Sequence, residues 1–363
     1  MQQDSTISRR RLLQTSVSAV ATAAFPLPTL AQTRTVKFTL PWLAQGTSAF
    51  PFVGKEKGFF SKRGIDLQIS RGFGSFPASQ AIANGQFDYG MVISAPLVLM
   101  VAKGLPLRGL ATIDYDAMMG VGVLEGSSIK APADLVGKKM ATVPASAESP
   151  FFAAYAKRIG IDPAKVTIVN VDPKVAERTL SDGQVDAMTG VASSSLPILL
   201  SQNHPARWML YSSAGIPTYG TDIVSTQTVV DGDPGLAAAM VDGLLESVAF
   251  TLTEPEESAD IFFKAVPEAG LTASARDFIH IGMALHRYAI AKPMPMEHGL
   301  GWGDPAVYDA ISDLAMTYLS TPEMKKPSVD SWYSNKFAGN IKLTSEQWAK
   351  VVASVGDYRK YLV

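Results

Sequence analysis

The chain contains no cysteine, which excludes disulfides, a thiolate nucleophile, a zinc-thiolate site and a lipid-bearing cysteine near the N-terminus. Histidine is scarce, and the four histidines have no metal-ligand spacing such as H-x-x-x-H. An excess of positive charge is also missing, because 32 basic residues stand against 33 acidic residues. A nucleic-acid-binding protein normally shows a basic patch or stripe. We therefore expect no metal, no cofactor and no nucleic-acid partner.

Long apolar runs are missing from the chain beyond its N-terminal segment, so we expect no later segment to span a membrane. The N-terminal segment begins with the paired arginines of Ser8-Arg9-Arg10-Arg11-Leu12-Leu13. A weakly apolar stretch follows and ends at the small residue Ala31. This pattern resembles a bacterial twin-arginine export signal, and its glutamine, serines and prolines would make a poor membrane anchor. We predict that residues 1–31 are a signal peptide and that the mature protein is soluble in the periplasm.

With 363 residues, of which 47% are hydrophobic, the chain can build two domains. Segments typical of strands and of helices alternate through its first two thirds, which predicts βαβ units and a parallel sheet in each lobe. The expected strands are 36–40, 66–70, 87–93, 107–113, 121–124, 139–143, 166–169, 185–189 and 208–211. Only helices are expected from about residue 233 onward. We predict a first lobe at 34–116 plus 223–363 and a second lobe at 117–222.

One short motif occurs twice, as N-G-Q-F-D at residues 84–88 and as D-G-Q-V-D at residues 182–186. In each copy we expect a helix to end, a glycine to close it in a left-handed turn, and a strand to follow. Asp88 and Asp186 are interpreted as structural residues that satisfy backbone groups of the turn, in preference to ligand contacts. The repeat therefore marks equivalent places in two lobes.

Ligands of open α/β sheets gather at the carboxyl ends of the strands, where free backbone N–H groups and positive helix ends point outward. Serines occupy such places in both predicted lobes, in Ser94-Ala95 and in Ser193-Ser194. The loops 72–76 and 146–149 lie at similar ends, although helix capping alone would explain them. Aromatic residues at loops favour a site for a flat or apolar group, and these are Trp42, Phe50, Phe73, Phe76, Tyr115, Phe151, Tyr219 and Trp302. The charged candidates are Arg71, Glu148 and Asp222.

Several motifs occur together in this chain: Trp42, V-G-K-E-K-G-F-F at 53–60 with G-I-D at 64–66, Gly74-Ser75 with the motif at 84–88, and I-K-x-P-x-D-L-x-G-K at 129–138. In these motifs the chain resembles the substrate-binding proteins of ABC transporters for nitrate, sulfonates, taurine and thiamine-pyrimidine precursors. The resemblance covers about residues 35–225 and is specific for the family, not for the ligand. It implies an α/β, type II periplasmic-binding-protein fold with two βαβ lobes, a hinge and a helical C-terminal tail. Such a protein closes on a small-molecule ligand and delivers it to a membrane permease.

The loop positions and the resemblance together predict the ligand-binding residues Trp42, Gly74, Ser75, Ser94, Ala95, Tyr115, Ser146, Glu148, Val191, Ser193, Ser194, Tyr219, Asp222 and Trp302. The Pro41-Trp42-Leu43 loop and Gly301-Trp302 look most like the pyrimidine-precursor branch, which implies an aromatic or N-heterocyclic solute. The fungal enzymes of that branch carry a cysteine-rich active-site motif. A chain without cysteine lacks that motif, so the resemblance implies binding and no enzymatic activity.

Two other functions stay open at this point. A sulfonate, taurine or nitrate binder would hold its anion with paired helix N-termini and Arg71. A periplasmic enzyme is the alternative class: spacing reveals no Ser-His-Asp arrangement, no G-x-S-x-G motif and no paired carboxylates, but catalytic triads can assemble from any chain order. A receptor that presents its ligand to a sensor has no distinguishing motif. We expect a monomer.

Overall fold

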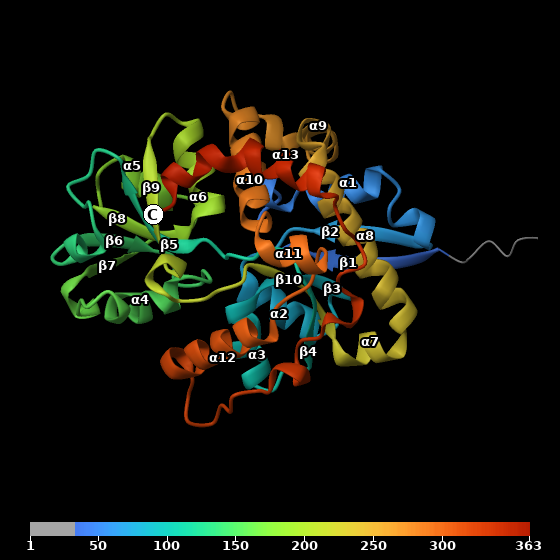
Figure 1. Cartoon of the computed structure of the whole chain (residues 1–363). Helices are drawn as coiled ribbons and strands as arrows, with labels where there is room; N and C mark the ends of the chain where they lie inside the picture. The colour runs from blue at the N-terminus through green and yellow to red at the C-terminus, as the bar shows by residue number, and fades with distance from the viewer. Residues whose placement is uncertain (1–32) are drawn as a thin grey trace, which may run out of the picture. The chain divides into compact units, whose positions relative to one another are not determined.

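The computed structural model describes residues 33–363, and the predicted signal peptide lies outside them. Two five-stranded sheets form the frame of this part of the chain, each flanked by helices (Figure 1). The first sheet has the order β2-β1-β3-β10-β4, built from Ile65–Ser70, Arg34–Thr39, Tyr89–Ile93, Thr221–Thr226 and Leu107–Thr112. The second has the order β7-β6-β8-β5-β9, built from Thr167–Asn170, Lys139–Thr142, Ala187–Val191, Met119–Leu124 and Ala206–Leu210. The predicted α/β class is confirmed.

Both sheets are mixed, whereas parallel sheets were expected. β10 runs antiparallel between β3 and β4, and β5 runs antiparallel between β8 and β9. The sequence prediction missed β10 because every residue of Thr221–Thr226 is buried, so the segment shows no alternation of apolar and polar residues. The chain passes from the first sheet to the second between β4 and β5, and it returns between β9 and β10. The lobe bounds given above stay a prediction.

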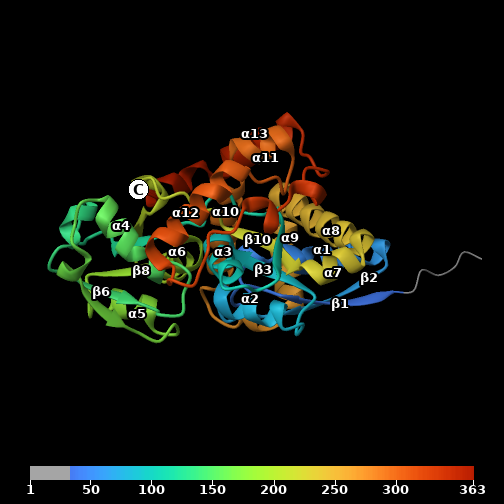
Figure 2. The ribbon, with the colours of Figure 1, turned by 90° about the horizontal axis from the view of Figure 1, so that it is seen from below.

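Helices cover both sheets, and those after residue 233 make up the expected helical tail. Before the tail come α1 (Phe50–Glu56), α2 (Ser75–Ala83), α3 (Ser94–Ala102), α4 (Phe152–Arg158), α5 (Ala176–Ser181), α6 (Ala192–Ser201) and α7 (Gln227–Gly232). The tail contains α8 (Pro234–Thr253), α9 (Pro255–Ala265), α10 (Ala275–Ile290), α11 (Pro293–His298), α12 (Pro305–Leu319) and α13 (Ser345–Val355). α8 packs on α1, α12 lies beside α3, and α10 packs on α6 (Figure 2). The tail therefore contacts helices of both sheets.

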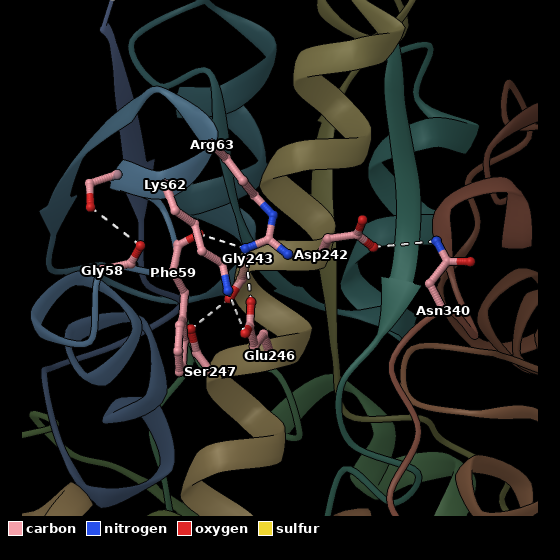
Figure 3. Close-up of polar contacts among 10 residues, drawn as sticks. Gly58, Phe59, Lys62, Arg63, Asp242, Gly243, Glu246, Ser247 and Asn340 are labelled. Atoms are coloured by element: carbon pink, nitrogen blue, oxygen red, sulfur yellow. Dashed lines mark hydrogen bonds and ion pairs between the residues drawn. The ribbon is translucent and has the colours of Figure 1, made fainter.

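α8 is long and apolar enough to cross a membrane, but 56% of its most apolar stretch is buried inside the protein, as in the core helix of a globular domain. Its more polar side binds the segment after α1 through ion pairs (Figure 3). Glu246 lies 2.6 Å from the Lys62 ammonium and 2.8 Å from the Arg63 guanidinium. Asn340 donates a hydrogen bond of 3.3 Å to Asp242. The two ion pairs fix α8 to the segment between α1 and β2, and the Asn340 bond fixes a later part of the tail to α8.

The repeated motif has the same hydrogen bonds in both sheets. The Asp88 carboxylate accepts from the backbone N–H of Lys37 at 2.8 Å, and the Asp186 carboxylate accepts from that of Lys139 at 2.8 Å. Each aspartate returns a backbone bond to the same residue, at 3.0 and 2.9 Å. The preceding glycines have the expected left-handed φ of 72° and 70°. The predicted structural role of Asp88 and Asp186 is confirmed. The backbone N–H group that each carboxylate binds, however, belongs to the neighbouring strand and not to the turn.

Candidate ligand-binding site

The predicted ligand loops of the two sheets contact each other. A Cβ added to Gly74, in the loop after β2, would lie 3.3 Å from the carbonyl oxygen of Ala145, in the loop after β6. The Gln45 side chain, in the loop after β1, donates a hydrogen bond of 2.8 Å to the Ser194 hydroxyl at the start of α6. All these loops follow the carboxyl ends of strands. The structure thus brings the loops predicted from the two halves of the sequence to one place.

Trp42 lies half-buried in the loop that follows β1. Its ring makes no contact with another aromatic ring within residues 33–363. Its carbonyl accepts a hydrogen bond of 2.8 Å from the Gly72 amide, which joins the loops after β1 and β2. A Cβ at Gly72 would lie 2.0 Å from the Leu40 carbonyl oxygen and 2.7 Å from the Pro41 carbonyl carbon. Only glycine allows this approach, so Gly72 helps to position Trp42.

Gly72→Ala should therefore displace the Trp42 loop. Both atoms nearest to the new methyl group are backbone atoms, which cannot rotate away. We expect a loss of about 1–3 kcal/mol in the free energy of unfolding, as for other overpacked sites, and at least about a tenfold loss of ligand affinity. Urea denaturation and calorimetric titration measure the two effects. Gly126→Ala is the matched control, because a Cβ there meets open space; equal behaviour of the two variants would contradict the role of Gly72.

The serines predicted in the first lobe are buried and already hydrogen-bonded. The Ser75 hydroxyl accepts a bond of 3.2 Å from the Ile93 amide, and the Ser94 hydroxyl donates one of 2.8 Å to the Tyr219 carbonyl. Ala95 is fully buried in α3 and offers no polar side-chain atom. Ser75 thus ties the start of α2 to the end of β3, and Ser94 ties the start of α3 to the chain that returns from the second sheet. Their contact with a ligand stays a prediction.

Tyr115, Tyr219 and Asp222, predicted from distant parts of the sequence, come together in one aromatic cluster. The Tyr115 and Tyr219 rings meet edge to face with centroids 5.6 Å apart, and Tyr219 meets Tyr308 at 5.2 Å. The Tyr308 hydroxyl donates to the Asp222 carboxylate and lies 2.6 Å from the Thr112 hydroxyl. Tyr308 comes from α12, and its position in an ordinary amphipathic helix gave no signal in the sequence.

Asp222 is fully buried, and burial raises the pKa of its carboxyl well above the ordinary value, against hydrogen bonds from Tyr308 and Thr112 that lower it. A carboxyl whose pKa is higher in the folded state than in the unfolded state costs stability as pH rises from the unfolded value toward the folded one. Each unit of raised pKa corresponds to about 1.4 kcal/mol. Asp222→Asn cannot ionise and should therefore become progressively more stable than the wild type between pH 4 and pH 8.

Urea denaturation across that pH range measures the difference between the two proteins. Asp222→Ala is the control: it also lacks the carboxyl and should show the same rise with pH, but loss of the bond from Tyr308 should keep it about 1–3 kcal/mol less stable than Asp222→Asn at every pH. A constant difference between wild type and Asp222→Asn would show that Asp222 ionises normally.

The chain between β4 and β5 is held by the end of α10 and the residues just after it, which the sequence did not predict. The His286 Nε2 atom lies 2.6 Å from the Asp114 Oδ1 atom, and the His286 ring stacks on Phe50. The Tyr115 amide donates to the Ala289 carbonyl at 3.1 Å. Burial lowers the pKa of Lys292, and the nearby Asp116 acts against this. The first crossing between the sheets is therefore anchored to the tail.

In the second sheet, Ser146 and Glu148 lie in the loop after β6, and the Ser146 hydroxyl donates a bond of 2.5 Å to the Glu148 carboxylate. Glu148 is only 3% exposed. Val191 and Ser193 are half-buried at the junction of β8 and α6. Trp302, between α11 and α12, stacks on His298 with ring centroids 4.1 Å apart, so one face of its indole is occupied.

An open hollow of about 610 Å³ lies at the opposite end of the second sheet. Its lining includes Glu125, Asp186 and His204, near the amino end of β8. The predicted ligand loops follow the carboxyl ends of β6 and β8, so this hollow is not the predicted site.

Solved structures define the class of fold. The periplasmic aliphatic sulphonate-binding protein SsuA of Escherichia coli aligns with 82% of this chain and 96% of its own, with a TM-score of 0.65 and 16% identity. The periplasmic nitrate-binding protein NrtA of Synechocystis aligns with 89% of both chains, with a TM-score of 0.58 and 15% identity. The predicted periplasmic-binding-protein fold is confirmed.

The NMT1/THI5 like family matches residues 45–258, and the chain belongs to this family. A formylaminopyrimidine-binding protein of Halalkalibacterium halodurans is 22% identical over 65% of this chain and 72% of its own length. A putative thiamine biosynthesis protein of Haemophilus influenzae is 26% identical over 66% of this chain and 76% of its own. Two yeast 4-amino-5-hydroxymethyl-2-methylpyrimidine phosphate synthases match only 43% of this chain.

Proposed function

We propose that this protein is the solute-binding component of an ABC importer and captures a small N-heterocyclic solute between its two lobes. The observation that carries the proposal is the meeting of ligand loops from both sheets, Gly74 with Ala145 and Gln45 with Ser194. The relative from Halalkalibacterium halodurans binds formylaminopyrimidine, and the fold neighbours include sulphonate-binding and nitrate-binding proteins. A binding protein is therefore favoured over the synthase activity of the partly matched yeast relatives.

A flat ring fits these loops better than a small anion does. Trp42 offers an indole face without an aromatic partner in the described part of the chain, and flat heterocycles stack on such faces. The guanidinium of Arg71, the basic group expected for an anion site, instead lies 4.5 Å from the ring of Phe73, which is 65% exposed. Arg71 also donates to the Gly72 carbonyl at 3.3 Å. Arg71 is thus engaged with Phe73 and Gly72, which counts against the anion-binding alternative.

The proposal also covers how the protein is exported, where its two lobes begin and end, and which partner receives its ligand. Residues 1–31 act as a twin-arginine signal and direct the protein to the periplasm. The first lobe comprises 34–116 plus 223–363, the second comprises 117–222, and the crossings between β4 and β5 and between β9 and β10 serve as the hinge. The protein acts as a monomer that delivers its ligand to a membrane permease.

Thermal unfolding of the purified protein with a panel of solutes tests the proposal. A ligand that binds only the folded state raises the melting temperature by mass action. We expect a rise with formylaminopyrimidine or 4-amino-5-hydroxymethyl-2-methylpyrimidine, and none with MOPS, taurine or nitrate. Native mass spectrometry of the protein as purified adds a second test, because a tightly held solute identifies itself by mass. The proposal would be contradicted if no solute raised the melting temperature and the native mass were that of the protein without a bound solute.

A further inference from the structure

Two carboxyl side chains lie at the carboxyl end of the second sheet. Glu148, in the loop after β6, is almost completely buried, and Glu177, in the first turn of α5 after β7, is half-buried. Each accepts one serine hydroxyl: Ser146 donates to Glu148 at 2.5 Å, and Ser195 donates to Glu177 at 2.8 Å. Ser195 follows Ser193 and Ser194 on α6, so the second carboxyl adjoins the predicted ligand loops.

Neither carboxyl forms a salt bridge within residues 33–363. A carboxylate can accept about four hydrogen bonds, and a buried carboxylate without a cation or enough donors is costly. The Thr189 hydroxyl and the backbone amide of Glu148 also face the Glu148 carboxylate, but Thr189 donates to Thr142 at 2.9 Å, and Thr142 pairs with Ser149 at 2.7 Å. The pair therefore has unused capacity for donors from outside the protein.

A third group at this place also lacks a partner. Tyr211 is fully buried, and its hydroxyl has no hydrogen-bond partner in the described part of the chain. Burial raises the pKa of Tyr211, and the nearby negative charge of Glu148 raises it further. An unpartnered buried hydroxyl beside an underused carboxyl indicates that this end of the lobe is built to receive polar atoms of a ligand.

We propose that Glu148 and Glu177 form the ligand subsite of the second lobe and accept N–H hydrogen bonds from an amino or amidine-like edge of the solute. The inference rests on the proposed function and narrows its ligand to amino-substituted N-heterocycles. With the ring held by Trp42 on the first lobe and the N–H edge held on the second, one ligand contacts both lobes. Anionic solutes are rejected by the same carboxyls.

Acid should weaken this binding. Burial raises the pKa of both carboxyls, and the negative charge of Glu177 raises that of Glu148 further. The serine and threonine hydroxyls act in the opposite direction, and Tyr211 is the other titratable group beside Glu148. Two interacting carboxyls titrate as a pair. Since an N–H donor prefers the ionised form, affinity should rise with pH through the raised pKa range and fall below it.

Calorimetric titration with 4-amino-5-hydroxymethyl-2-methylpyrimidine, from pH 5 to pH 8, tests the inference. Glu148→Gln and Glu177→Gln should each weaken binding about tenfold to a hundredfold at pH 8, the range for a hydrogen bond to a charged group. Both losses should shrink as the pH falls. The ligand's own ionisation is common to all proteins compared, so it cancels in the ratio of wild type to variant. Glu125→Gln, an exposed carboxyl in the turn after β5, is the matched control and should bind as the wild type does.

Unchanged affinity for the pyrimidine in both variants would overturn the inference. Wild-type protein that binds MOPS in preference to the pyrimidine would overturn it too, while leaving a solute-binding function intact. Absence of any melting shift with the whole panel counts against the proposed function itself. Melting curves check that each variant folds, and if Glu148→Gln does not, the half-buried Glu177→Gln decides alone.

Discussion

Trp42→Ala should abolish measurable binding of a pyrimidine ring, whereas a small anion, if it were the solute, would only bind more weakly. The side chain is half-buried at the end of β1, and its ring has no aromatic neighbour within residues 33–363. Aromatic residues bury 150–250 Å² in contacts, and central anchors of this kind cost 2 kcal/mol or more when truncated. We therefore expect a loss of about a hundredfold or more for the ring. An anion held by backbone N–H groups would lose much less.

Calorimetry with formylaminopyrimidine measures this loss, and taurine tests the anion-binding alternative, because the proposed function expects no binding of taurine by either protein. Tyr318→Ala provides the matched control, because this aromatic residue of α12 is 38% exposed and lies outside the ligand loops. Ring binding by Trp42→Ala within about fivefold of the wild type would remove Trp42 from the site. The melting temperature without ligand should change little in either variant, which separates a binding defect from a folding defect.

Trp208→Ala should cause a large loss of stability. Trp208 is fully buried in β9, and three glycines, two of β5 and one of β8, make room for its indole. A Cβ on Gly122 would lie 2.3 Å from the ring, and one on Gly120 or Gly190 would lie 2.9 Å from it. Truncation leaves a cavity that these strands cannot fill, because they carry no side chains there. We expect a loss of about 3–5 kcal/mol in the free energy of unfolding.

The same substitution should weaken ligand binding. The indole Nε1–H donates a hydrogen bond of 3.0 Å to the Gly190 carbonyl, just before Val191 and the start of α6. Trp208→Phe is the comparison variant, since it fills most of the cavity but cannot donate that bond. It should lose less stability than Trp208→Ala, and urea denaturation ranks the three proteins. Equal stability of wild type and Trp208→Ala would contradict the packing described for these strands.

Much of the fold could be predicted from the sequence because local patterns determine it. The strand and helix alternation, the glycine turns at Gly85 and Gly183 and the helical tail depend on neighbouring residues, and all are present. Strand direction depends on partners far away in the chain, so the antiparallel course of β5 and β10 was not predictable. β10 itself was missed because it is buried on both faces and carries Asp222 in its interior.

The candidate site was predictable only where it is built from loops. Trp42, Gly74 and the serines of α6 follow strand ends, which is a rule about position in a sheet. Glu177, Tyr308 and His286 come from helices in which charged and aromatic residues are ordinary, and only the fold brings them beside the loops. A residue pattern cannot show which helical face will meet a site formed more than a hundred residues away.

The paired bonds of Asp88 and Asp186 also affect how the strands find their alignment during folding. A parallel strand that slips by two residues keeps its apolar face inward, so side-chain alternation alone does not reject the slip. The carboxylate bonds to Lys37 and Lys139 would be lost in such a slip, and they join residues 51 and 47 positions apart. Each sheet therefore contains its own reference point for the alignment of one pair of parallel strands, β1 with β3 in the first sheet and β6 with β8 in the second.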